Sequence, residues 1–270
     1  MFEVGILNSQ GLNVLLIGSE NTEYILSSKF LRKMYAVSDK NVEGVVNISF
    51  NTFKELAQKC KTLQIDLVLV EDERWINEGI ADVMKSNYIN CVAPTSDWTK
   101  LALSNSYLRQ LLEKYGFNLP KTTLLPSEFP LIVKGDGVLK KADCLQDVIK
   151  IRQEVYNKSP HIAAGLYLEK YLEGEKFYII SLYDGKNLIT FPVENVPEEM
   201  LSEFSKKTEV MLNKENANFL GFIQSEVILC DNMLYNTGFK FGFRKINCDI
   251  DILYLLWMAI YGKLNEISIT

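Results

Sequence analysis

Hydrophobic residues in the first third of the chain form short runs that alternate with amphipathic segments. Residues 12–18 (LNVLLIG) are an apolar run that ends in glycine, and residues 22–34 have apolar positions at helical spacing. The same order of strand and helix is repeated over 42–87, and a last short strand follows at 90–94. Strands that alternate with helices pair in parallel through right-handed crossovers. We therefore predict a small doubly wound sheet in an N-terminal Rossmann-like domain, residues 1–94.

The pattern becomes mixed after this domain. A long helix is predicted over 96–116, with Asp97 as its N-cap and Gly116 closing its C-terminus. Asn51 is the natural N-cap of the earlier helix. The later segments alternate or are amphipathic. In order they are a strand at 130–137, a helix at 142–157, three strands over 165–192, a helix at 197–214, a strand pair over 219–236 and a final helix at 250–264.

These later strands are close enough in sequence to pair as antiparallel neighbours. Asp184 and Gly185 predict a tight hairpin between the last two strands of the group of three. The fold class is therefore α/β, with α+β character in the second half. We predict that residues 95–270 form one region of antiparallel lobes, with a small middle lobe at about 127–192.

Composition narrows the classes of partner. The chain has 270 residues, 47% hydrophobic and 23% charged, and its net charge of −5 comes from acidic and basic residues mixed along the sequence. This argues against nucleic acid and against an anionic membrane as partner. Five widely spaced cysteines with a single histidine argue against a zinc site and a disulfide framework. The N-terminus has no basic signal region and no run is long enough to span a bilayer, so we expect a cytoplasmic protein.

One stretch carries more than a fold class. The sequence LYLEKYLEGEKFYIISLYDGKNLITFP at 166–192 resembles the central ATP-grasp motif of the phosphoribosylamine–glycine ligase (glycinamide ribonucleotide synthetase) family of purine synthesis. LNVLLIGSE at 12–20, KYGFNLP at 114–120, LIVKGDG at 131–137 and NTGFKFGFRK at 236–245 are similar to further family motifs, in the family's order. The resemblance implies a parallel N-terminal sheet followed by an ATP-grasp-like pair of antiparallel α+β lobes.

The resemblance also implies a nucleotide site. By position, the adenine edge would face Glu169, Lys170, Tyr171 and Leu172. The ribose would face Glu175, and a phosphate would face Lys134. The alternative is that the apolar members of this set are sheet core and the charged members a solvated edge. ATP is therefore a candidate cofactor, and a nucleotide or small molecule a candidate partner.

For magnesium, the resemblance implies Glu226 and Asn236 as ligands. Asn236 and Gly238 stand where the family has a metal-binding Glu and Asn. Hard cations need anionic oxygen ligands, so these replacements argue against tight binding of Mg-ATP. Glu226 has the alternative of being an exposed strand residue. No residue is assigned a catalytic role.

Other family features are replaced. Ser104 and Asn105 stand where the family has a phosphate-facing lysine, and GDGVLKKADC passes into a helix without a glycine-rich flap. Lys140 and Lys141 are either substitute point charges or exposed turn lysines. The first turn, GSENTEYIL, lacks the family's small glycines, and the loop expected to contact the amine substrate is absent. Family members continue for about another domain, so we expect a shortened member.

Three hypotheses remain. The first is a degenerate, catalytically impaired homologue, a pseudoenzyme that binds a ligand or a partner protein. The second is an ATP-dependent carboxylate–amine ligase that makes glycinamide ribonucleotide or acts on a related small substrate. The third is a structural subunit, with self-association through Phe239, Phe241 and Phe243, which at period two would share one face. That face is either buried sheet core or a docking surface.

Overall fold

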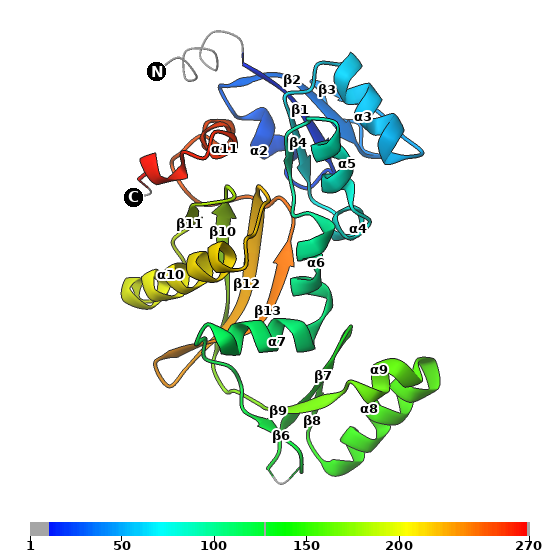
Figure 1. The fold of residues 1–270 in the computed structure, drawn as a ribbon, viewed down its shortest axis with the longest axis vertical. Helices are drawn as coiled ribbons and strands as arrows, with labels where there is room; N and C mark the ends of the chain where they lie inside the picture. The colour runs from blue at the N-terminus through cyan, green and yellow to red at the C-terminus, as the bar shows by residue number, and fades with distance from the viewer. Residues whose placement is uncertain (1–10, 127, 269–270) are drawn as a thin grey trace.

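The computed structural model describes residues 11–126 and 128–268. Residues 1–10 of the predicted first domain, and residue 127 at the predicted start of the middle lobe, lie outside the described residues. The described chain contains three sheets, which follow one another along the long axis of the molecule (Figure 1). A parallel sheet comes first and two antiparallel sheets follow, so the predicted fold class is confirmed.

The first sheet has five parallel strands in the order β3-β2-β1-β4-β5. Their bounds are Leu12–Ile17 for β1, Leu31–Val37 for β2, Val45–Asn47 for β3, Leu67–Val70 for β4 and Cys91–Val92 for β5. Both faces of β1 are buried, as expected for a central parallel strand covered on both sides. The helices of this part are α2 (Thr22–Leu26), α3 (Phe53–Thr62), α4 (Glu73–Asn77) and α5 (Ile80–Ser86).

The helix predicted over 22–34 was wrong in its second half. Helix α2 ends at Leu26, and residues Leu31–Val37 form β2, which pairs with β1 on one side and β3 on the other. Met34, Tyr35 and Ala36 are consecutive buried residues. A strand between two neighbours buries both faces, and this favours β2 over a helix that would expose one of them.

Two expected N-caps differ, and one predicted helix is divided into two. The helix predicted over 96–116 is two helices, α6 (Ser96–Leu103) and α7 (Asn105–Lys114), because Ser104 is extended and accepts a hydrogen bond from the Tyr107 amide. Thr95, not Asp97, precedes α6, and Thr52, not Asn51, caps α3. Gly116 adopts a left-handed φ of 69° after α7, the conformation for which glycine is favoured at a helix end.

The second sheet along the chain, called the middle sheet because it contains the strands of the predicted middle lobe before β10 (Glu175–Tyr183), is antiparallel, in the order β6-β9-β7-β8. In space it lies at one end of the molecule, and the sheet formed by the later strands lies between it and the parallel sheet (Figure 1). The strands are β6 (Thr122–Thr123), β7 (Leu131–Gly135), β8 (Val138–Ala142) and β9 (Tyr167–Lys170). Helices α8 (Leu145–Lys158) and α9 (Pro160–Ala164) connect β8 to β9. A small apolar core lies between α8 and this sheet, where Val148 and Ile151 pack with Val133 and Leu168.

The third sheet has the order β11-β10-β12-β13. Its strands are β10 (Glu175–Tyr183), β11 (Leu188–Thr190), β12 (Gly221–Cys230) and β13 (Met233–Phe241), and α10 (Glu198–Lys214) lies beside it (Figure 1). The strands β10 and β11, which the predicted middle lobe includes, therefore pair with β12 and β13 and not with β7–β9. The division into domains stays a prediction.

The chain then returns to the first sheet. Helix α11 (Ile252–Ile260), followed by a short 3-10 turn (Leu264–Glu266), places six of its residues in a core shared with β1, β2 and β4. Gly242 allows this return, because it has a φ of 122° and an added Cβ would lie 2.8 Å from the Glu71 carbonyl oxygen. The C-terminal helix therefore belongs structurally with the N-terminal sheet.

The three spaced phenylalanines are buried. Phe239 and Phe241 pack in one hydrophobic cluster, whereas Phe243, beyond the turn at Gly242, packs in the cluster around α11. The docking-surface alternative was therefore wrong, and so was the expectation that all three would share one face.

Asp251 tests the docking of α11. Its carboxylate accepts hydrogen bonds from the amides of Leu253 and Tyr254 at the helix start, and from the Ser28 hydroxyl and the Lys29 amide near β2. Asp251→Ala should lower the free energy of unfolding by about 1–3 kcal/mol, because a cap and a tertiary contact are lost together. The measurement is urea denaturation. Asp249→Ala, at an exposed position two residues earlier, is the control and should stay within about 0.5 kcal/mol of the unchanged protein.

Candidate functional site

A cavity of about 230 Å³ lies between the middle sheet and the third sheet. Its lining includes five of the six residues predicted for ATP and one of the two predicted for magnesium, namely Lys134, Glu169, Lys170, Tyr171, Leu172 and Glu226. The segment 170–172 is where the chain leaves β9 for β10, so it joins the two sheets. Apolar side chains, among them Ile132 and Leu139, line the cavity beside it.

Two predicted residues lie outside the lining of this cavity. Glu175 is exposed at the start of β10, where it pairs with Leu229. Asn236 is only 2% exposed, its Oδ1 accepts a hydrogen bond from the Gly238 amide, and its Nδ2 has no partner in the described part of the chain. The Asn236 oxygen is thus engaged in the bulge of β13. The ligand roles of all these residues stay predictions.

Lys134 is a buried cation with two partners. Its ammonium donates to the Thr237 carbonyl oxygen on β13 at 2.8 Å and lies 3.4 Å from Glu169 Oε2 on β9. Arg109 from α7 completes the group, with Nη1 2.9 Å from Glu169 Oε1. Burial lowers the pKa of Lys134, while the neighbouring Glu169 carboxylate opposes this shift. The lysine predicted to contact a phosphate therefore links β7 to β13 through its own bonds.

Glu226 is also paired within the protein. Its Oε1 lies 2.6 Å from the Lys240 ammonium, and this hydrogen bond raises the pKa of Lys240. Gly238 leaves room for the carboxylate, because an added Cβ there would lie 3.0 Å from Glu226 Oε2. Glu73 on α4 lies near this pair, and partial burial raises its pKa against the opposing charges of Lys240 and Arg244. Lys240 was not identified as a site residue from the sequence. The available signal was its position between Phe239 and Phe241, since a lysine between two buried residues of one strand points to the opposite face of the sheet.

The turn between β7 and β8 is held against α7. Asp136 accepts hydrogen bonds from the Asn105 amide at 2.8 Å and the Ser104 hydroxyl at 3.3 Å, and the Asn105 side chain donates to the Gly135 carbonyl oxygen at 2.6 Å. Ser104 and Asn105, where the family lysine is expected, thus bind the protein's own hairpin. Lys140 and Lys141 beyond it are exposed and paired with Glu154 and Asp143, so the exposed-lysine interpretation is the one that the structure favours.

A second buried carboxylate lies at the carboxyl ends of β1 and β4. Glu71 accepts hydrogen bonds from the amides of Glu20 and Asn21 and from the Asn21 side chain, at 2.6 to 2.9 Å. An added Cβ at Gly18 would lie 2.1 Å from Glu71 Oε2, so this glycine is required by the carboxylate. The order of the strands reverses between β1 and β4, the point where doubly wound sheets bind their ligands. Here the protein fills that point with its own side chain.

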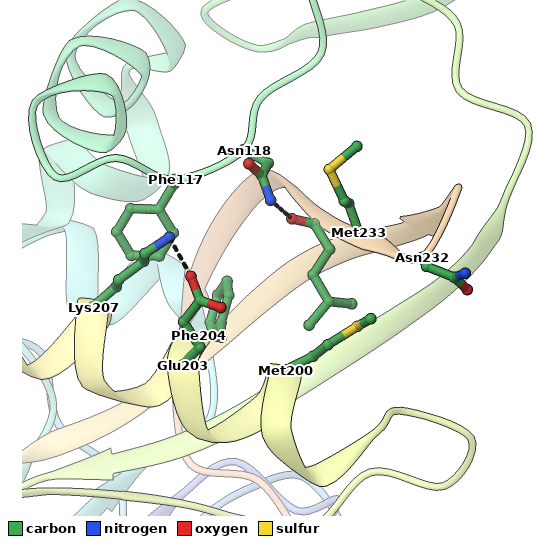
Figure 2. A pocket seen from close by; sticks show the side chains of 9 residues that line it. Phe117, Asn118, Met200, Glu203, Phe204, Lys207, Asn232 and Met233 are labelled. Carbon is green, nitrogen blue, oxygen red and sulfur yellow. Dashed lines mark hydrogen bonds and ion pairs between the residues drawn. The ribbon is translucent and has the colours of Figure 1, made fainter.

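A smaller cavity, of about 170 Å³, lies between α10 and the turn of the β12–β13 hairpin (Figure 2). Met200 and Phe204 of α10 line one side, and Met233 the other. Among the polar groups at its edge, Lys207 is paired with Glu203, and the Asn118 side-chain amide donates to the Leu234 carbonyl oxygen. It has no unpaired charge with which to orient a polar ligand.

The arrangement of the sheets is that of the ATP-grasp fold. The phosphoribosylamine–glycine ligase of Thermotoga maritima superposes with a TM-score of 0.66 at 14% identity, covering 86% of this chain and 69% of that one. A biotin carboxylase from Campylobacter jejuni, solved as a β,γ-ATP complex, superposes with a TM-score of 0.71 at 11% identity, covering 92% and 70%. At these identities the likeness establishes the fold.

Sequence comparison is more specific. The family model described as phosphoribosylglycinamide synthetase, N domain, matches residues 12–102. The human trifunctional purine biosynthetic protein adenosine-3 is 26% identical over 211 residues, which are 66% of this chain and 21% of that protein. The phosphoribosylamine–glycine ligase of Rhizobium meliloti is 24% identical over 204 residues, 66% of this chain and 48% of that enzyme. The predicted resemblance to the phosphoribosylamine–glycine ligase family is confirmed. The matched part of the chain spans about half the length of the ligase from Rhizobium meliloti and about a fifth of the human trifunctional protein.

Within 11–126 and 128–268, no helix is long and apolar enough to cross a membrane. In the same residues no three histidine, cysteine, aspartate or glutamate side chains come together as a metal site would require. The cytoplasmic location stays a prediction.

Glu71 provides the test of the first turn. Glu71→Ala should lower the free energy of unfolding by about 1–3 kcal/mol, because two backbone amides and the Asn21 side chain lose their acceptor. Urea denaturation measures this. Glu20→Ala, an exposed carboxylate in the same turn, is the matched control and should change stability by less than about 0.5 kcal/mol. Equal effects of the two substitutions would contradict a structural role for Glu71.

Proposed function

We propose that this chain is a degenerate homologue of phosphoribosylamine–glycine ligase that binds an adenine nucleotide in the cavity beside residues 170–172 and does not carry out ligation. One observation supports this most strongly. The charged groups expected to grip phosphate and metal, Lys134 and Glu226, are paired with other groups of the same chain. The same cavity is also lined by apolar side chains, against which a base could pack.

The base-binding half fits a flat heterocycle. Ile132 and Leu139 on the middle sheet and Phe177 and Ile228 on the third sheet contribute to the lining. The segment 170–172 runs along one edge of this space. Mostly apolar walls with a few polar groups are the usual composition of a small-molecule site.

The phosphate half is poorly suited to a triphosphate. The reaction of ATP-grasp ligases requires free cations and metal ions around the transferred phosphoryl group. Here the Lys134 ammonium already has a hydrogen bond to the Thr237 carbonyl oxygen and an ion pair with Glu169, and the β7–β8 turn is held by Asp136 instead of extending over a ligand. Breaking these contacts to admit ATP would leave Glu169 buried beside Arg109 alone.

The substrate end is filled as well. The resemblance leads us to expect a phosphorylated sugar near the first turn, and the Glu71 carboxylate occupies the amides of that turn. A substrate phosphate would have to displace a buried anion that accepts three hydrogen bonds. In this proposal residues 1–94 support the fold, and residues 95–270 form the ligand cavity.

An ATP-dependent carboxylate–amine ligase is the second candidate. It is favoured by the gathering of Lys134, Glu169 and Glu226 around one cavity, the same groups that the resemblance assigns to nucleotide and metal. This alternative requires ADP formation that depends on magnesium, on an added amine and on a carboxylate.

Ligand binding tests the cavity directly. Adenosine or AMP, at about one hundred times its dissociation constant, should stabilise the protein by about 2.7 kcal/mol, seen as a rise in melting temperature. Leu139→Trp, whose side chain would fill the cavity from an exposed strand position, should weaken binding at least about tenfold. Ile149→Trp, equally exposed on α8 of the same lobe, is the matched control and should bind as the unchanged protein does. Equal affinity in all three proteins would place the ligand elsewhere.

Turnover separates the two candidates. Incubation with phosphoribosylamine, glycine, ATP and magnesium should give no glycinamide ribonucleotide and no ADP above background, because the phosphate-binding groups are already paired. The measurement is product analysis by mass spectrometry with an active family ligase as the positive control. Formation of the product would contradict the proposal and establish the second candidate.

A further inference from the structure

Lys240 lies beside the cavity, in contact with one of the residues that line it. Its ammonium lies 2.6 Å from Glu226 Oε1, and Glu226 lines the cavity. The register of β12 and β13 pairs Glu226 with Gly238 and Gln224 with Lys240, so Lys240 and Glu226 are diagonal neighbours on one face of the sheet. The contact therefore follows from the strand pairing.

The residues present do not fit magnesium. Magnesium takes octahedral oxygen ligands, commonly carboxylates and substrate phosphates. Of the positions implied by the resemblance, Glu226 is neutralised by Lys240, Asn236 gives its oxygen to the Gly238 amide, and Gly238 has no side chain. A dication at Glu226 would lie against a fixed ammonium. The charge that a metal would supply is already present as a side chain.

The Lys240 ammonium retains capacity for a ligand. An ammonium has three donors, and the contact with Glu226 uses one of them. The side chain is 44% exposed, so the other donors can reach a ligand oxygen. Arg244, whose Nε donates to Gln224 on β12, adds a second cation near the pair, and Glu73 lies close enough to oppose it. The formal charges of these two cations and two carboxylates cancel, so the group offers a ligand only the free donors of Lys240, which suit one phosphate group better than three.

We propose that Lys240 acts as a built-in counter-cation in place of magnesium, so that the cavity binds an adenine mononucleotide without a divalent metal. This inference rests on the proposed function, since it requires the adenine site. It goes beyond that function by naming the ligand class, the residue that contacts the phosphate, and the metal independence of binding. The Glu226 carboxylate positions the Lys240 ammonium for this contact.

Calorimetric titration with AMP, in EDTA and then in magnesium, tests the inference. AMP should bind the unchanged protein with the same affinity, within about twofold, in both buffers, and more tightly than ATP in magnesium. Lys240→Met should weaken AMP binding at least about tenfold in EDTA, because a charge-assisted hydrogen bond to phosphate is lost. Its affinity for adenosine, which has no phosphate, should stay unchanged.

Two control variants complete the experiment. Lys240→Arg keeps the cation and should retain AMP affinity within about threefold. Lys59→Met removes a lysine of similar exposure that is also paired with a glutamate, but on α3 of the first domain, and should have no effect. Melting curves of each variant without ligand establish that it is folded.

The outcomes are distinguishable. Binding of AMP only when magnesium is present would overturn the inference and leave the proposed function standing. Unchanged AMP affinity in Lys240→Met would also overturn it, by removing Lys240 from the site. If neither adenosine, AMP nor ATP bound in either buffer, the proposed function would fail together with the inference.

Discussion

The hydrogen bond from the Lys134 ammonium to the Thr237 carbonyl oxygen joins the two antiparallel sheets and fixes the spacing between them. Lys134 belongs to β7 and Thr237 to β13, and Glu169 and Arg109 compensate the buried charge from β9 and α7. A buried ammonium is costly unless it is paired and hydrogen-bonded, so these four residues constrain one another. The width of the cavity and the orientation of residues 170–172 depend on this constraint.

The same physical solution recurs at the other positions where a ligand's charge would be expected. Glu71 accepts hydrogen bonds from the amides of the first turn, Asp136 accepts them from the Asn105 amide and the Ser104 hydroxyl at the start of α7, and Lys240 neutralises Glu226. In each case the partner of the charged group belongs to the chain itself. A scaffold stabilised in this way does not need a ligand to satisfy its polar groups. Charges that are already paired are not available to a transferred phosphoryl group, and this supports the proposal of a binding role.

Much of the scaffold could be predicted because local patterns and global fold agree. The run at β1 is buried on both faces, the Asp184–Gly185 hairpin forms, and the segment 170–172 lies at the cavity that its resemblance indicates. Residues 31–37 could not be assigned correctly, since their apolar spacing suits a helix as well as a strand and only pairing with β1 and β3 decides between them. The break at Ser104 likewise depends on Asp136, thirty-two residues away.

The sequence by itself determined the fold class, the family resemblance and which residue types stand at the positions expected to hold metal and phosphate, since these are properties of residue type and spacing. Only the tertiary structure decided what the remaining charges do. Arg109 reaches Glu169 and Glu71 reaches Asn21 across 60 and 50 positions of the chain. Whether a charge meets solvent, a ligand or a partner within the protein depends on such distant contacts, because electrostatic pairing acts through space and is not encoded in neighbouring residues.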